Sequence, residues 1–223
     1  QVSRLSYAEA DTALSSGPLA QLASLATIRR AYRSKAGAVD IDIPEVRVWV
    51  RDGKPNIDII PDFRSSGVVR EMMVLAGEAV ARWAFDRSLP FPYYSQEAPG
   101  SRDELPEGLA GEFAKRRLMR AGMAGAQPRA HQGLGVTMYA QSTSPLRRYG
   151  DLLGHQQIRA WLAKEAGIPS IPPLAADELS LRLAKAAAAM SAVRKAERCS
   201  QAHWTLVWLL EHPDWTGEGI VVQ

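Results

Sequence analysis

The chain is poor in cysteine, with Cys199 alone among 223 residues. A single cysteine excludes a disulfide framework and any cysteine-based zinc cluster, and it fits a reducing, cytoplasmic location. The sequence also lacks an apolar run of the ~20 residues that a membrane helix needs. No charged start precedes an apolar stretch. We therefore expect neither a membrane span nor a signal peptide.

The excess of basic over acidic residues is small, with a net charge of +3 and an isoelectric point of about 9.1. This balance permits a polyanionic partner and would help to steer it, but it does not identify one. Hydrophobic residues make up 46% of the chain, which is ordinary for a globular protein. Because the chain starts on Gln1 and stops on a strand-like Gly219–Gln223, we expect a piece of a longer protein. We also expect a monomer.

The pattern of apolar residues predicts an α+β fold with much helix and a mixed sheet packed by several long helices. Helices are expected over 6–35 with a break at Gly17–Pro18, over 67–86, over 113–120, from Pro145 to Glu165, and over 177–210. Val46, Val48 and Val50 alternate with polar or aromatic residues before the turn 52–55, which predicts a β-hairpin with 57–60. A short strand is expected over Gly133–Tyr139.

The pair Ser144–Pro145 is typical of a helix start, because a serine hydroxyl can cap the N-terminus of the helix. Proline at the first helical position loses no hydrogen bond. The first turn of a helix carries unpaired N–H groups and partial positive charge, so it binds anions. Arg147 and Arg148 would lie in that turn, where cations are unfavourable unless an anion docks. Arginine suits a phosphate, since its planar fork bonds two oxygens at once.

An ordinary alternative is that Arg147 pairs with Asp151 four residues later and only decorates the surface. Asp151 and His155 are also four apart, a spacing that usually means a local hydrogen bond. No third ligand lies nearby, so the sequence predicts no metal site here. By themselves, Glu71 and Glu197 are helix-surface residues, and His131 favours a structural role.

The run from His131 to Leu162, with Thr143-Ser-Pro-Leu-Arg-Arg-Tyr149 at its centre, resembles the ribonuclease II / ribonuclease R family of exoribonucleases. Three further stretches resemble that family in order and spacing: Arg70-Glu-Met-Met-Val-Leu-Ala-Gly77, Leu89 to Pro99, and Lys195-Ala-Glu-Arg198. The resemblance implies that residues 1–212 are the C-terminal part of an RNB catalytic domain. Residues 213–223 would then begin a C-terminal OB-fold that binds RNA.

The resemblance also implies an activity, namely processive 3′-to-5′ hydrolysis of single-stranded RNA to nucleoside 5′-monophosphates with two Mg²⁺ ions. By position, Arg147 matches the arginine at the scissile phosphate, with Ser144, Arg148 and Tyr149 beside it. Glu197 matches a glutamate near the 3′-terminal nucleotides, and Glu71 matches one that reads the end nucleotide.

The sequence departs from the family pattern at several positions. The aspartate cluster that holds the metal is expected upstream of residue 1, since Asp40 and Asp42 stand in the wrong context. Gly77, Tyr94 and Gln156 replace an asparagine and two arginines, and each change could trim RNA contacts. The alternatives to an active exoribonuclease are therefore a non-catalytic RNA-binding relative with a degraded metal site, and a helical module whose basic segments meet an acidic protein.

Overall fold

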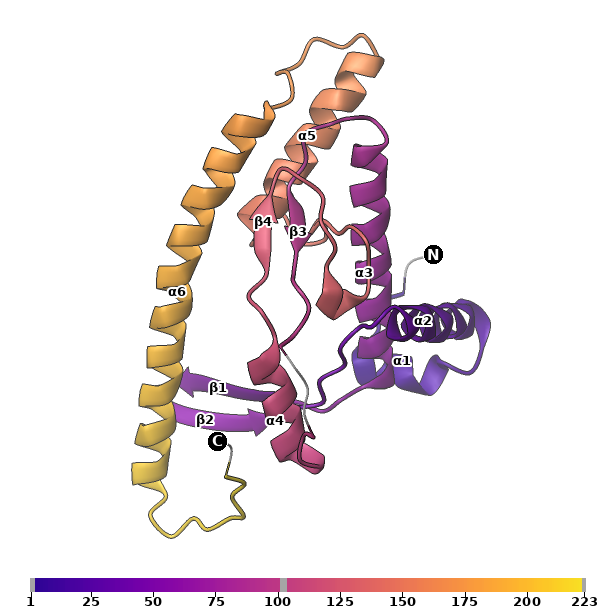
Figure 1. Cartoon of the computed structure of the whole chain (residues 1–223). Coiled ribbons are helices and arrows are strands. Elements are labelled where there is room, and N and C mark those ends of the chain that lie inside the picture. The colour runs from indigo at the N-terminus through magenta and orange to yellow at the C-terminus, as the bar shows by residue number, and fades with distance from the viewer. Residues whose placement is uncertain (1–2, 101–103, 222–223) are drawn as a thin grey trace. The chain divides into compact units, whose positions relative to one another are not determined.

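The computed structural model describes residues 3–100 and 104–221 and confirms the α+β class (Figure 1). The chain divides into two compact units. The first unit comprises Gln1–Asp40, Phe63–Gly100 and Met119–Ala186, and the second comprises Ile41–Asp62, Ser101–Leu118 and Ala187–Gln223. Each unit is built from segments that are far apart in the sequence.

The first unit contains the helices predicted from apolar periodicity. They are α1 (Tyr7–Ala13), α2 (Gly17–Lys35), α3 (Arg64–Phe85), α5 (Tyr149–Glu165) and the start of α6 (Ala176–Glu211). Ser6 caps α1 in a capping box with Glu9, because the hydroxyl and the carboxylate satisfy each other's backbone N–H groups. The predicted break at Gly17–Pro18 is confirmed, since α2 begins there.

The predicted strand over Gly133–Tyr139 is wrong. Residues Gln132–Leu134 form a short 3-10 helix, η1, followed by Gly135 with φ of +64°. Isolated bridges join His131 to Val136 and Tyr93 to Ala140, while β3 (Tyr93–Ser95) pairs with β4 (Met123–Gly125). A left-handed residue interrupts an extended strand, so the segment turns where alternation alone predicted continuation.

The main core of the first unit lies where α3, the β3 segment and α5 meet. Its buried side chains come from α3 and from the segments around β3 and Tyr139: Ala81, Ala84, Leu89, Phe91, Tyr93, Met138 and Ala140. Gln157 of α5 is fully buried, and its amide bonds the carbonyls of Pro90 (2.8 Å) and Leu174 (2.9 Å) and accepts from Leu174 N–H (2.7 Å). Because these hydrogen bonds satisfy the buried Gln157 amide, they fix the position of α5.

The second unit contains the predicted hairpin, with β1 (Val46–Arg51) antiparallel to β2 (Lys54–Ile59). Asp52 and Gly53 both have positive φ, as a two-residue hairpin turn requires. Hydrogen bonds from Arg47 and Trp49 lower the pKa of Asp58 below its usual value. In α4 (Gly108–Leu118), the carboxylate of Glu112 accepts from the Asp42 backbone and from Lys115.

The strands that the structure describes pair in two separate antiparallel ribbons rather than in one mixed sheet. At the C-terminal end, Gly219–Val221 have no regular structure, and residues 222–223, where the predicted strand would continue, lie outside the described residues. None of the described helices combines the length and the apolar character needed to cross a membrane.

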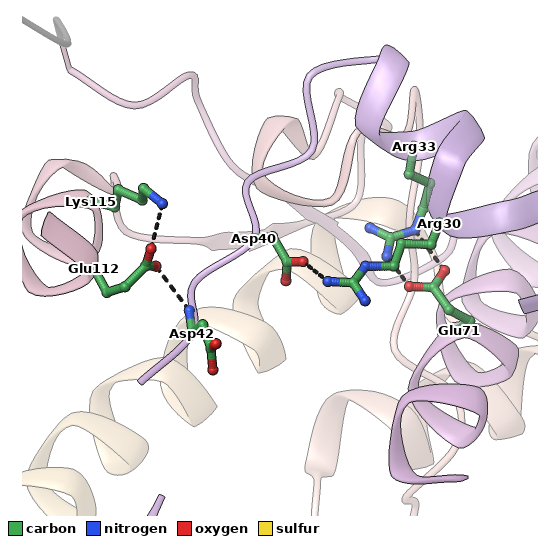
Figure 2. Close-up of polar contacts among 7 residues, drawn as sticks. All are labelled: Arg30, Arg33, Asp40, Asp42, Glu71, Glu112 and Lys115. Carbon is green, nitrogen blue, oxygen red and sulfur yellow. Dashed lines mark hydrogen bonds and ion pairs between the residues drawn. The ribbon is translucent and has the colours of Figure 1, made fainter. Parts of the chain in front are cut away.

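A buried ion pair joins α2 to α3 within the first unit. Arg33 bonds both carboxylate oxygens of Glu71, with Nε at 3.0 Å from one of them, and its Nη1 bonds the Leu134 carbonyl at 2.9 Å. Side-chain exposures are 9% for Arg33 and 7% for Glu71. Figure 2 shows the pair face to face, with Arg30 turned instead toward Asp40. Arg33 therefore ties α2, α3 and η1 together.

Gly77 is a second point of close contact, between α3 and the Tyr139 segment. A Cβ placed on Gly77 would overlap the Tyr139 ring and lie 2.5 Å from the Ala140 carbonyl oxygen. The backbones are also joined, since Ala140 N–H bonds the Gly77 carbonyl at 3.2 Å. The helix approaches the segment this closely only because residue 77 has no side chain.

We expect Gly77→Ala to lower the free energy of unfolding by about 1–3 kcal/mol, because the methyl group overpacks a tight contact. The matched control is Gly67→Ala in the same helix, where nothing lies within 4 Å. That change should be neutral or stabilising, because alanine favours helix more than glycine does. Urea unfolding of both variants tests the difference, and equal effects would contradict it.

We expect Arg33→Ala to cost about 3–5 kcal/mol of stability, because it leaves the Glu71 carboxylate buried without a partner. The double variant Arg33→Met/Glu71→Leu should be much closer to the parent protein, since no buried charge remains. Urea unfolding measures all three proteins. A double variant less stable than Arg33→Ala would show that packing rather than charge pairing determines the loss.

Candidate RNA-binding site

The segment from Ser142 to Arg148 precedes α5 as a turn and not as the first turn of the helix. Helix α5 begins at Tyr149 with Arg148 as its N-cap, so the predicted start at Ser144–Pro145 is wrong. The N–H groups of Arg147 and Arg148 instead bond the Ser144 carbonyl at 3.2 Å and 3.0 Å. Proline at the second position of a β-turn explains this geometry, because its fixed φ suits a turn as well as a helix start.

Asp151 occupies the third position of α5 and is fully buried. Its Oδ2 atom accepts three hydrogen bonds, from Ser144 N–H (2.8 Å), Arg148 Nε (3.1 Å) and Arg148 Nη2 (2.7 Å). The Nη2 group also donates to Thr143 Oγ1 at 3.1 Å. The partner of Asp151 is thus Arg148 and not Arg147, which corrects the ordinary alternative drawn from i,i+4 spacing.

His155 lies one turn further along α5 and holds the other end of the same segment. Its Nε2 atom lies 2.7 Å from the Ser142 carbonyl oxygen. A carbonyl only accepts, so Nε2 carries the proton. The hydrogen bond between Asp151 and His155 expected from their spacing is not among the contacts of the described residues. Both side chains instead bind the preceding segment, which we call the 142–148 loop.

Arg147 remains exposed, and its guanidinium has no ion pair or hydrogen bond to any residue that the structure describes. Beside it, Leu146 is wholly exposed and Tyr149 is 45% exposed. The first N–H groups of α5 have no acceptor within the helix. The tip of the loop therefore presents a bidentate donor, unpaired among the described residues, next to a helix N-terminus, and both features suit an anion.

The structure leaves other predicted site residues in different environments. Glu71 uses both oxygens in the ion pair with Arg33, a partner 38 residues away that helix periodicity does not reveal. Glu197 is exposed on α6 in the second unit. Ser144 contributes its backbone N–H and carbonyl to the loop. The structure brings Ser144, Arg147, Arg148 and Tyr149 together in one segment.

The segment that faces the loop contains Tyr139 and His131, whose rings meet edge to face at 5.6 Å. Burial raises the pKa of Tyr139, and the Arg148 and Asp151 charges act on it in opposite directions. Burial lowers the pKa of His131 below its ordinary value. Burial thus disfavours the charged form of His131, whose ring packs against Tyr139.

Two of the three positions that depart from the family pattern, Gly77 and Tyr94, are packing positions. Gly77 gives Tyr139 its place, as described above. The Tyr94 hydroxyl sits over Gly150 of α5, close enough that a Cβ there would clash. In the sequence, the only sign of this contact is Gly150, the residue before Asp151. The contact cannot be predicted from that glycine alone, because only the fold places Tyr94 opposite it.

The described residues do not fit a metal ion, since no group of three or more His, Cys, Asp or Glu side chains gathers in them. Asp40 pairs with Arg30, and the backbone of Asp42 bonds Glu112 (Figure 2). Asp151, the one buried aspartate among the described residues, binds three donors through Oδ2, while its Oδ1 is buried without a hydrogen-bond partner. The exposed charged group at the tip of the 142–148 loop is the cation Arg147, which suits an anion rather than a metal ion.

The chain matches the RNB domain over residues 1–164. It is 30% identical to an uncharacterized ribonuclease of Synechocystis sp. over 99% of this chain and 34% of that protein. It is 33% identical to the chloroplastic/mitochondrial ribonuclease II of Arabidopsis thaliana over 84% of this chain and 24% of that protein. The chain thus spans about a third or less of the length of these relatives.

Solved structures share the fold at lower identity. The Dss1 exoribonuclease of Candida glabrata superposes with a TM-score of 0.78 at 20% identity, over 95% of this chain and 30% of that one. The RNase R of Mycoplasma genitalium in complex with ribose-methylated single-stranded RNA gives 0.72 at 19%, over 87% and 36%. Yeast Ssd1, a pseudonuclease, gives 0.56 at 14%, over 82% and 27%.

The match to the RNB domain covers most of the chain, and the similarity to the Synechocystis ribonuclease runs along nearly all of it. The solved RNase R and Dss1 structures have the same fold. These findings show that the chain belongs to the RNB family.

Proposed function

We propose that this chain is the part of an RNB exoribonuclease that holds the 3′ end of single-stranded RNA, with Arg147 at the scissile phosphate. One observation carries the proposal: of two adjacent arginines, Arg148 is neutralised by buried Asp151, whereas Arg147 is exposed and unpaired in the described residues. A cation held out from a rigid loop beside a helix N-terminus favours a phosphate strongly.

The geometry suits charge that develops during hydrolysis. An arginine donates two parallel N–H bonds to phosphate oxygens, and preorganised donors stabilise a transition state without the cost of rearrangement. The Arg148–Asp151 pair and the His155 bond hold the loop before RNA arrives. The backbone that carries Arg147 is therefore held in advance, and only the Arg147 side chain has to be ordered when it binds.

The other predicted residues have two kinds of role in this proposal. Tyr149 and Glu197 are exposed and face solvent, and the side chain of Tyr149 also hydrogen-bonds Arg182. Arg148 and Glu71 act mainly by position, because their charged groups already have partners within the protein. Ser144 acts by position through its backbone N–H, which bonds Asp151.

The finer parts of the proposal concern the whole protein. Hydrolysis runs processively from the 3′ end, releases nucleoside 5′-monophosphates and depends on Mg²⁺ ions whose ligands lie outside residues 1–223. The protein works in the cytoplasm as a monomer, and residues 213–223 begin an OB-fold that binds RNA. The relatives named as ribonucleases support this proposal.

The intact protein should shorten a 5′-labelled oligo-RNA in the presence of Mg²⁺, and Arg147→Ala should slow the reaction by about 10²-fold or more, as loss of one transition-state donor does. Single-turnover degradation, followed on a gel, measures the rate. Arg159→Ala is the matched control, because Arg159 is exposed on α5, the helix that follows the loop, and has no partner in the described residues. It should leave the rate nearly unchanged.

Equal rates for Arg147→Ala and the parent protein would remove Arg147 from the proposed role. RNA binding that weakens steeply with salt, with no nucleotide released by the intact protein, would favour the alternative of a non-catalytic RNA-binding relative. No binding of single-stranded RNA at low salt would favour a module that meets an acidic protein.

A further inference from the structure

We infer that Asp151 is a positioning residue, which acts through Arg148 and the Ser144 peptide to aim Arg147 at the phosphate. This inference rests on the proposed function and deepens it. Asp151 is wholly buried, so it touches no RNA. Its effect must pass through the groups that it binds, and these groups are the two ends of the turn that carries Arg147.

The burial of Asp151 has to be offset by the bonds that it makes. An isolated carboxylate in a protein interior is strongly unfavourable unless it is paired and hydrogen-bonded. Oδ2 of Asp151 accepts from one backbone N–H and two guanidinium N–H groups. Because all three donors come from residues 144 and 148, the carboxylate is stable only while the 142–148 loop keeps this shape.

The same contacts place the adjacent side chains of Arg147 and Arg148 in different environments. Arg148 is turned inward, with Nε and Nη2 committed to Asp151 and Thr143. Without Asp151, the Arg148 guanidinium would be free to compete with Arg147 for the phosphate, and the Ser144 N–H would lose its acceptor. The carboxylate therefore decides which of the two arginines is presented.

Helix α5 supplies a rigid mount for this arrangement. Asp151 and His155 lie on one helix face, since residues four apart are neighbours, and His155 holds the Ser142 carbonyl at the loop's other end. Between them, Leu153 and Gly154 are buried, and Gly154 packs against the Phe91 ring. The loop is thus braced at both ends from a helix fixed in the core.

A double-mutant cycle in the intact protein tests the inference. Asp151→Asn keeps the shape and a neutral acceptor at the Oδ2 position but removes the charge that pairs with Arg148. We expect it to slow single-turnover RNA degradation roughly 10- to 100-fold, as a misplacement of about 1 Å does. In the Arg147→Ala background the same substitution should cause no further loss, because the group that Asp151 positions is already absent.

A merely structural role gives a different result. If Asp151→Asn only lowered the fraction of folded enzyme, its loss of rate would multiply with the loss caused by Arg147→Ala. Independent, multiplying losses in the cycle would therefore overturn the inference. A slow Arg147→Ala variant would in that case still support the proposed function. No effect of Arg147→Ala would overturn both. Glu165→Gln is the matched control, since Glu165 is exposed on α5 with no partner in the described residues. This substitution should change the rate little, and its small effect should be the same in the parent protein and in the Arg147→Ala background.

A second cycle covers the case in which Asp151→Asn fails to fold, as judged by thermal unfolding. Arg148→Lys keeps the charge opposite Asp151 but replaces the two-point fork by a single ammonium. We expect a slower parent reaction and, again, no further loss in the Arg147→Ala background. Full activity of Arg148→Lys, or losses that multiply, would overturn the inference.

Discussion

The buried carboxylate of Asp151 is the constraint on which the candidate site depends. A carboxylate without exposure requires several charge-assisted hydrogen bonds, and three donors reach its Oδ2 atom from one short loop. The loop cannot relax without leaving that charge unsatisfied. Arg147 stays outside this network and remains exposed to solvent, because any change in the loop would leave the buried Asp151 carboxylate without its hydrogen bonds.

That constraint is useful only because α5 itself is immobilised. Gly150 and Gly154 let the Tyr94 and Phe91 rings pack directly on the helix backbone. Gln157 then bonds the carbonyls of Pro90 and Leu174 from the interior. These contacts come from segments more than fifty residues before α5 and from the loop after it, so the position of Asp151 is determined by the whole first unit.

The departures from the family pattern acquire a physical meaning in the same way. Gly77 and Tyr94 replace polar residues, and from the resemblance alone they suggest lost RNA contacts. In the fold each is half of a tight pair, Gly77 with Tyr139 and Tyr94 with Gly150. Both pairs border the segment that faces Asp151 and Arg148. They shape the surroundings of the loop through packing, a role separate from direct contact with RNA.

The sequence by itself determined the features that depend on near neighbours. Apolar periodicity located the helices around Gly17–Pro18, α3 and α6, and one long motif located Arg147. Alternating residues before a turn placed at 52–55 located the hairpin, whose turn in the structure is the two residues Asp52 and Gly53. Only the tertiary structure decided the rest. Ser144–Pro145 became a turn because a carboxylate seven residues later binds its N–H, and Glu71 became an internal ion pair because Arg33 folds against it from another helix. Hydrogen bonds and charges in a low-dielectric interior act between residues distant in sequence, and local patterns hold no information about them.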